Sequence, residues 1–230
     1  MANPTEETLT IAERVELGRR MRKIGGNSIV PFPEAWDEEM LQTQFASGEM
    51  GKLASSKDKG YKITSIHRYY DDGGALFFAV LRLEDGANKT FLPLRATVYG
   101  GWNPKFQIKS LDVPRPLYGL DLLACSPDKP VLIVEGEKTA DAARVKFPGY
   151  VVISWLGGAQ AIGNIDLRPL AGRNITIWPD NDDAGRTAAE KLGIRLNDLG
   201  VSSLTVVGLP PSFPDKWDLA DAIPENCNDE

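Results

Sequence analysis

The stretch VLIVEGEKTADAA, residues 131–143, decides the fold of this chain. Its first four residues are apolar, as in a strand that is buried on both faces, and they run directly into a turn that contains Gly136. A helix-forming segment follows the turn. A strand, a tight turn and a helix in this order predict the repeating unit of a parallel sheet.

The same order recurs along the rest of the chain. We expect strands at residues 131–134, 150–154, 174–178 and 203–207, and helices at residues 137–147 and 183–199. Together they predict an α/β domain over residues 126–230, in which a Rossmann-like parallel four-stranded sheet carries helices on both faces.

The segment before this domain has a different pattern. Residues 61–108 contain three β-rich runs separated by turns with acidic residues and glycine, which predicts an antiparallel meander. A short helix is expected within residues 114–127, so residues 61–125 are interpreted as a smaller, β-rich α+β subdomain. Residues 1–60 are expected to be helical and loop-rich, with a helix at residues 11–24.

Charge divides the chain into two parts. The formal net charge is −6, but residues 52–115 hold eleven Lys/Arg against six Asp/Glu, whereas residues 116–230 hold ten against seventeen. A basic surface that attracts phosphate beside an acidic site that collects metal ions would give this distribution, and so would uneven surface charge.

Several classes of protein are disfavoured by composition. The sequence has one histidine and two cysteines without a CxxC pair, so neither a structural zinc site nor a common hydrolase triad is expected. No apolar run approaches the ~18–20 residues of a membrane span, and the N-terminal residues lack a signal-peptide core. We therefore expect a cytoplasmic protein.

Acidic residues follow three of the predicted strands. Glu135 follows the first, Asp180 and Asp182 follow the third, and Asp218 comes after the fourth. Ligands of parallel sheets bind beyond the carboxyl ends of the strands, so these side chains can converge. Oxygen ligands without nitrogen or sulfur favour Mg²⁺ or Mn²⁺. The alternative is that the acids merely cap the helices that follow.

Two of these stretches resemble one family. VLIVEGEKTADAA resembles the glutamate motif of the Toprim domain, and IWPDNDDAGRTAAEKL, residues 177–192, resembles its Asp-x-Asp motif. The resemblance covers residues 130–223. It implies that Glu135, Asp180 and Asp182 serve as metal ligands and as acid or base, with Asp218 as an additional acidic position.

The preceding segment resembles the catalytic core of bacterial and phage-type DNA primases. The order is Gly74 and then Arg82, followed by Pro-Lys-Phe at 104–106 and Leu-Tyr-Gly-Leu at 117–120. The resemblance implies a nucleotidyltransferase that makes short primers on single-stranded DNA from nucleoside triphosphates, as in the DNA replication of phages or mobile elements. The residues that would bind nucleotide or nucleic acid are Arg82, Lys105, Lys138 and Arg186.

Two other functions stay open. A magnesium-dependent nuclease of the Toprim class would use the same acids to activate water. A non-catalytic module that binds nucleic acid would need no chemistry at all. The sequence has no GxxxxGK[ST] motif, so any helicase activity is expected in a separate partner.

Overall fold

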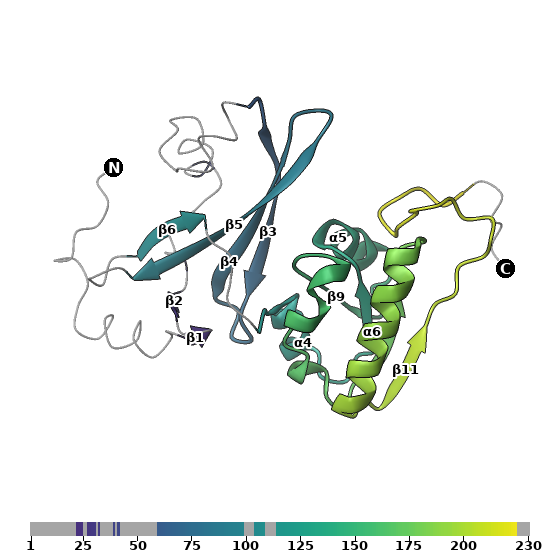
Figure 1. Ribbon diagram of the computed structural model, residues 1–230. Coiled ribbons are helices and arrows are strands. Elements are labelled where there is room, and N and C mark those ends of the chain that lie inside the picture. Colours follow the sequence, from purple (N-terminus) through teal and green to yellow (C-terminus); the bar gives the residue numbers. More distant parts are fainter. Residues whose placement is uncertain are drawn as a thin grey trace. The chain divides into compact units, whose positions relative to one another are not determined.

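The computed structural model describes residues 22–24, 27–30, 32, 39, 41, 59–98, 104–108 and 114–224. The chain divides into two compact units, Met1–Asp112 and Val113–Glu230. Each unit has its own sheet, and Figure 1 shows the strands of both (Figure 1). The two units are described separately.

The first unit contains the antiparallel meander expected from the sequence. Strands β3 (Lys62–Tyr70), β4 (Leu76–Glu84) and β5 (Lys89–Val98) pair in succession, each antiparallel to the next. Asp71 stabilises the first connecting turn, because its Oδ1 accepts hydrogen bonds from the backbone N–H groups of Gly73 and Ala75, both at 2.9 Å.

Three further strands join this sheet. β1 (Arg22–Ile24) pairs with β2 (Asn27–Val30), and β2 and β6 (Pro104–Ile108) both pair with β5. The helix predicted at residues 11–24 is therefore wrong for Arg22–Ile24, and its remainder lies outside the described residues. The physical reason is that β1 pairs in a hairpin with β2, which itself pairs with the distant β5, and this sheet pairing outweighs a local helical spacing.

The core of this sheet lies along β4. Residues 77–81 and Leu83 are buried, so side chains on both faces of the strand are covered. Phe78 packs edge to face against the buried Tyr69 of β3, with ring centroids 5.3 Å apart. Burial on both faces agrees with the apolar run Leu76–Leu81, which makes up most of β4.

The second unit has a five-stranded sheet in the order β11-β10-β8-β9-β7. Its strands are β7 (Leu117–Tyr118), β8 (Val131–Val134), β9 (Val151–Trp155), β10 (Asn174–Trp178) and β11 (Ser203–Val206). The last four are mutually parallel, whereas β7 is antiparallel to β9. The α/β class is confirmed, and β7 is an addition to the expected sheet.

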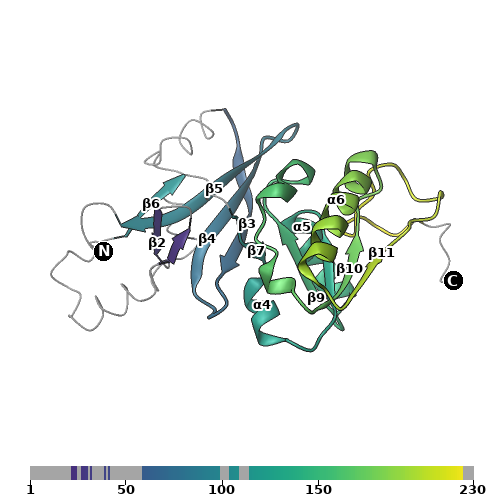
Figure 2. The ribbon, with the colours of Figure 1, turned by 60° about the horizontal axis from the view of Figure 1, so that its bottom comes forward.

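Helices cover this sheet from two sides, as Figure 2 shows (Figure 2). They are α4 (Leu120–Cys125), α5 (Glu137–Lys146) and α6 (Asp183–Leu199), together with the 3-10 segments η2 (Ala159–Asn164) and η3 (Arg168–Leu170). Alternate residues of each strand point to opposite faces. Ile133 and Ile177 lie in one core with Leu192 of α6, whereas Leu132 and Ala140 of α5 are buried outside that core.

Residues 117–125, which the sequence assigned to the preceding subdomain, lie in the second unit. The reason is visible at Leu-Tyr-Gly-Leu. The Tyr118 hydroxyl donates to Asp141 of α5 at 2.8 Å, and the Arg144 guanidinium lies 4.4 Å from the centroid of the Tyr118 ring. Arg144 also donates to Asp141 and to the Val152 carbonyl. The motif therefore fastens β7 to α5 and β9.

Gly119 is the residue of this motif that tolerates least change. Its φ is +91°, and a Cβ placed there would lie 2.8 Å from Nη2 of Arg144 and 3.2 Å from the Val152 carbonyl oxygen. We predict that Gly119→Ala lowers the free energy of unfolding by about 1–3 kcal/mol, from backbone strain and displacement of Arg144.

Chemical denaturation measures this loss. Gly149→Ala is the matched control, because a Cβ at Gly149 meets no atom within 4 Å and its φ is not positive. Equal stabilities of the two variants would contradict the structural role given to Gly119.

Candidate functional site

The acidic residues predicted from the sequence follow adjacent strands. In the pairing of β8 with β10, Val134 lies opposite Trp178, so both strands end at the same level of the sheet. Glu135 comes directly after β8, and Asp180 comes two residues after β10. Parallel pairing therefore brings the two turns together at the carboxyl edge.

Glu135 is held by the turn that follows β9. Its Oε1 accepts a hydrogen bond from the backbone N–H of Ala159 at 3.0 Å. Gly158, with φ +63°, allows this approach, since a Cβ there would lie 3.2 Å from the same oxygen. Burial raises the pKa of the Glu135 carboxyl, the Ala159 N–H lowers it, and the charge of Asp182 raises it further.

Asp180 is the most strongly perturbed acid of the site. Burial raises the pKa of its carboxyl to about 7, and the charges of four neighbouring acids raise it too: Glu135, Asp218, Asp182 and Asp221. The start of α6 packs against its backbone, because a Cβ on Gly185 would lie 2.5 Å from the Asp180 carbonyl oxygen. Five carboxylates from three loops thus influence one another here.

Helix capping explains only part of this cluster. Asp182 is the N-cap of α6, and its Oδ1 accepts from the Gly185 N–H at 2.7 Å. Asp183, one residue later, is exposed and pairs with Arg186 at 2.7 Å. Neither contact gives a reason for the half-buried carboxyl of Asp180.

The loop after β11 brings the remaining acids. Asp218 Oδ1 accepts from the Ala220 N–H at 2.5 Å, and Asp221 Oδ2 accepts from the Asp218 N–H at 3.1 Å. Lys146 of α5 donates from Nζ to the carbonyl oxygens of Leu219 and Asp221, at 2.6 and 3.1 Å. Sequence reasoning missed Asp221 and Lys146; the spacing of the two aspartates in WDLAD was the available signal for the first.

The acids of this site offer the type of ligand atom, oxygen, that a hard divalent cation such as Mg²⁺ prefers. All five acids supply oxygen, and a cation would offset the repulsion that raises the pKa of Asp180. One oxygen each of Glu135, Asp182 and Asp218 is bonded to a backbone N–H. Over residues 59–98 and 114–224, no three Asp, Glu, His or Cys side chains lie in a metal-holding arrangement.

The predicted basic residues are divided between the two units. Arg82 of β4 donates to Glu84 Oε1 at 2.8 and 2.5 Å and lies 6.0 Å from the Phe91 ring centroid. Lys105 lies in β6 opposite Thr97. In the second unit, by contrast, Lys138 is exposed on the first turn of α5, and Arg186 lies on the first turn of α6.

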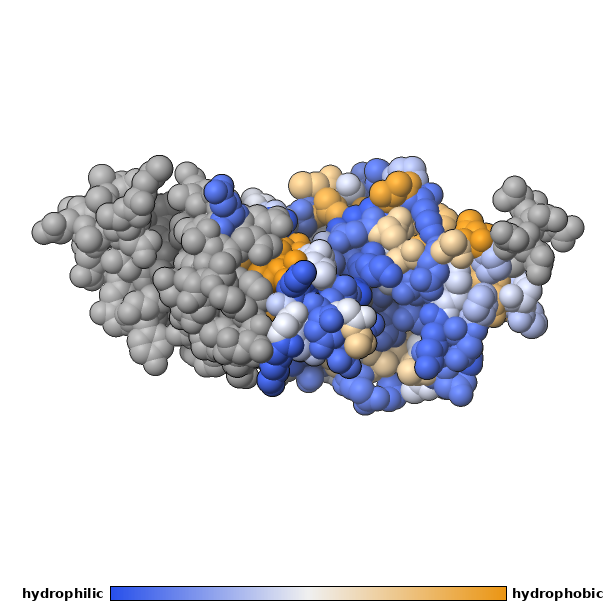
Figure 3. Space-filling model, turned by 90° about the horizontal axis from the view of Figure 1, so that it is seen from above, coloured by the Kyte–Doolittle hydropathy of each residue, from blue (hydrophilic) through white to orange (hydrophobic). Residues whose placement is uncertain are grey.

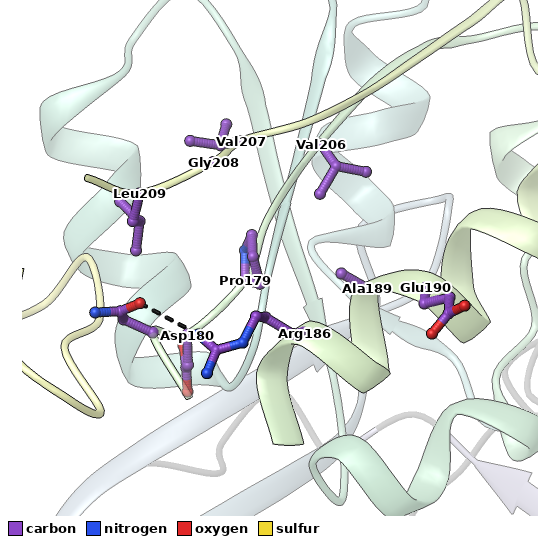
Figure 4. A pocket seen from close by; sticks show the side chains of 10 residues that line it. Pro179, Asp180, Arg186, Ala189, Glu190, Val206, Val207, Gly208 and Leu209 are labelled. Atoms are coloured by element: carbon purple, nitrogen blue, oxygen red, sulfur yellow. Dashed lines mark hydrogen bonds between the residues drawn. The ribbon is translucent and has the colours of Figure 1, made fainter. Parts of the chain in front are cut away.

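A cavity of about 400 Å³ adjoins Asp180 (Figure 4). It lies between the start of α6 and the chain that follows β11, and Arg186, Ala189, Val206 and Leu209 line it. Arg186 Nη1 donates to Asn181 Oδ1 at 3.4 Å beside it. From the direction of Figure 3, the second unit shows a mostly hydrophilic surface with scattered apolar side chains (Figure 3).

The raised pKa of Asp180 predicts a pH-dependent stability of the metal-free protein. The unfolded chain loses the Asp180 proton near pH 4, but the folded protein holds it up to a pH of about 7. The contribution of Asp180 to the free energy of unfolding is thus fully present below pH 4 and is lost as the pH rises to 7. After allowance for solvent screening, we expect a loss of about 1–2 kcal/mol.

Urea unfolding at several pH values, with chelator present, measures this slope. Asp180→Asn should flatten it, whereas Asp198→Asn, at an exposed position of α6, should leave it unchanged. A wild-type slope equal to that of Asp180→Asn would contradict the unfavourable burial of charge at Asp180.

The described residues contain no helix that is long and apolar enough to cross a membrane. A comparison of the sequence with curated proteins gives no match.

A comparison with solved structures finds matches to primases. The zinc-binding and RNA polymerase domains of Aquifex aeolicus primase match with 16% identity and a TM-score of 0.48, over 92% of this chain and 52% of that chain. The primase fragment of the bacteriophage T7 primase-helicase matches with 19% identity and a TM-score of 0.41, over 65% of this chain and 53% of that one. The chain thus spans about half the length of each.

A third solved structure, the DnaG catalytic core, matches with 19% identity and a TM-score of 0.44, over 91% of this chain and 67% of that chain. A family model described as "Domain of unknown function (DUF6371)" matches residues 46–181, which is more than half of the sequence. The chain is therefore a member of the DUF6371 family.

Proposed function

We propose that this protein is a Toprim-type, primase-like nucleotidyltransferase that depends on a divalent metal ion. The observation that carries the proposal is the meeting of Glu135, Asp180 and Asp182 at the carboxyl ends of the adjacent parallel strands β8 and β10. Residues 131–143 and 177–192 resemble the two Toprim motifs, and this resemblance also supports a metal-dependent role for the three acids. The primase resemblance of residues 61–120 favours primer synthesis as the reaction.

Some of the acids would bind the metal ion, and one would take part in proton transfer. Asp180, Asp182 and Asp218 would hold Mg²⁺ or Mn²⁺, which when bound neutralises the triphosphate and the charge that develops in the transition state. Glu135 would orient the reacting hydroxyl or accept its proton. Burial raises the pKa of the Glu135 carboxyl, which makes its carboxylate a stronger base than that of an exposed glutamate.

The reaction itself is a phosphoryl transfer. The 3′-hydroxyl oxygen of the primer forms a bond to the α-phosphorus of the incoming nucleotide. The bond from that phosphorus to the bridging oxygen breaks, and pyrophosphate leaves. The hydroxyl proton passes to Glu135. The chain's own contribution is to position these groups and to offset their charge.

The basic residues would hold phosphates. Lys138 and Arg186 belong to the same unit as the acids and would bind the nucleotide. Arg82 and Lys105, in the other unit, would bind the single-stranded DNA template. Arg82 can do so only by exchanging its contact with Glu84 for a phosphate. Any helicase would be a separate partner.

A Toprim-class nuclease is the second candidate function, and the contacts of the Leu-Tyr-Gly-Leu motif are compatible with it. Tyr118 and Gly119 of the Leu-Tyr-Gly-Leu motif make structural contacts with α5 and β9. These two residues therefore have a structural role, which a nuclease could share. Incubation with labelled nucleotides, single-stranded DNA and Mg²⁺ or Mn²⁺ separates the two, because extended and shortened products are resolved on one gel.

Glu135→Gln tests the chemistry. The variant keeps the shape of the side chain and removes its charge, so nucleotide incorporation should fall by at least about 10²-fold. Because repulsion among the acids falls, the melting temperature of the metal-free variant should equal or exceed that of wild type. Asp198→Asn, far along α6, is the control and should keep full incorporation. A destabilised but active Glu135→Gln protein would overturn the catalytic role.

Removal of charges on β4 and β6 tests the DNA interaction. Binding to single-stranded DNA should weaken with salt, and Arg82→Ala with Lys105→Ala should flatten the salt dependence by up to about two phosphate equivalents. Glu84→Gln should instead tighten binding, since it frees the Arg82 guanidinium. Glu190→Gln makes the same change of charge on α6 and serves as the control. Tightening by both variants alike would show a general charge effect and exclude Arg82 as the contact.

A further inference from the structure

The acids Asp218 and Asp221 lie on a segment without helix or strand. This segment, residues 213–221, is here named the acidic loop. Different residues hold its two ends. At the C-terminal end of the loop, Lys146 donates to the carbonyl oxygens of Leu219 and Asp221. At its N-terminal end, the loop is bonded to Asn181, the middle residue of the Asp180–Asp182 turn.

Asn181 uses both its backbone and its side chain for this purpose. Its backbone N–H donates to the Trp217 carbonyl at 2.9 Å, and its own carbonyl accepts from the Lys216 N–H at 2.9 Å. The side-chain Nδ2 donates to the carbonyl oxygens of Phe213 and Pro214, at 3.0 and 2.8 Å. An amide nitrogen has two hydrogens, so both donors are satisfied by the acidic loop.

The acidic loop would not keep this shape unaided. Lys216 has a φ of +62°, and among the described residues it is the one residue other than glycine with a positive φ. Such a conformation is disfavoured for a residue with a Cβ and persists where surrounding contacts enforce it. The contacts here are those of Asn181, together with the edge-to-face packing of Phe213 on the buried Trp217, at 4.6 Å between centroids.

The position of the acidic loop matters to the site. The charges of Asp218 and Asp221 contribute to raising the pKa of Asp180, and the backbone of Lys216 and Trp217 is bonded directly to Asn181, so the acidic loop lies against the Asp180–Asp182 turn. Asp218 follows Trp217 directly, and the Trp217 carbonyl is one of the atoms bonded to Asn181. A loop that departed from Asn181 would carry both acids away from the Asp180–Asp182 turn.

We propose that Asn181 is a positioning residue that fastens the acidic loop to the Asp180–Asp182 turn and so brings Asp218 and Asp221 to the carboxylate of Asp180. The inference rests on the proposed metal-dependent function. It assigns Asn181 no contact with the metal or the substrate. Its role is to join two parts of the chain that are more than thirty residues apart.

Two substitutions distinguish positioning from a simple effect of charge. Asn181→Ala removes both Nδ2 bonds and adds no charge. Asn181→Asp keeps the size of the side chain but sets carboxylate oxygen against the Phe213 and Pro214 carbonyls, which repels the acidic loop. If only local charge mattered, Asn181→Asp would add a sixth acid and tighten cation binding. Positioning predicts weaker binding by both variants.

The first measurement follows the acidic loop without metal. Trypsin cleaves after Lys216, and mass spectrometry of the full chain gives the rate of that cut. Losing two hydrogen bonds should raise the rate about 10-fold or more in Asn181→Ala. Asn197→Ala, an exposed amide on α6, is the control and should match wild type. An unchanged rate in Asn181→Ala would overturn the fastening role.

The second measurement is Mn²⁺ binding, read from the electron paramagnetic resonance signal of the free ion. We expect both variants to bind Mn²⁺ about 10- to 100-fold more weakly than wild type, the usual effect of removing a group that orients ligands. Asn181→Ser, which keeps one donor, should lie between wild type and Asn181→Ala and guards against loss of folding. Equal or tighter binding by Asn181→Asp would overturn the inference.

The two failures can be told apart. If the wild-type protein binds no Mn²⁺, the proposed function is rejected, and so is the role of Asn181 in bringing acids to a metal site. The trypsin rates would still show whether Asn181 holds the loop. A wild type that binds Mn²⁺ together with variants that bind it equally well would leave the proposed function standing and reject the inference.

Discussion

Parallel pairing of β8 with β10 is the constraint on which the site depends. With Val134 opposite Trp178, both strands must end at one edge, and the acids that follow them must share a small volume. Like charges in such a volume repel one another, and burial increases the cost because less water screens them. The raised pKa of Asp180 reflects first its burial and then the charges of the neighbouring acids.

The surrounding structure offsets this repulsion with backbone donors. Glu135 receives an N–H from the turn after β9, Asp182 receives one from the start of α6, and Asp218 receives one from its own loop. The Gly157–Gly158 turn makes the first contact possible, since Gly158 leaves room for the Glu135 carboxyl. Among the described residues, no backbone N–H donates to the side chain of Asp180, so its charge is the least compensated of these. A bound cation would therefore compensate negative charge mainly at Asp180.

Much of the second unit could be predicted from the sequence. The strands Val131–Val134 and Asn174–Trp178 have the predicted bounds, because short apolar runs bounded by glycine, proline and acids admit few other conformations. Glu135 and Asp180 could be placed at one edge by the rule that parallel strands end together. Arg22 and Lys23 show the limit: their helical spacing was a local signal, whereas they lie in β1, whose hairpin partner β2 is joined to the sheet by pairing with β5, far away in the sequence.

The sequence by itself determined the α/β class, the strands of the parallel sheet and the acids at their ends, because apolar periodicity and turn residues act over a few neighbours. The tertiary structure decided which groups surround those acids. That Leu-Tyr-Gly-Leu fastens β7 to α5, that Arg82 is engaged by Glu84, and that Asn181 holds a loop more than thirty residues away all depend on contacts between distant segments. Such contacts follow from how the chain packs, since burial and long-range hydrogen bonding arise only when separated segments meet.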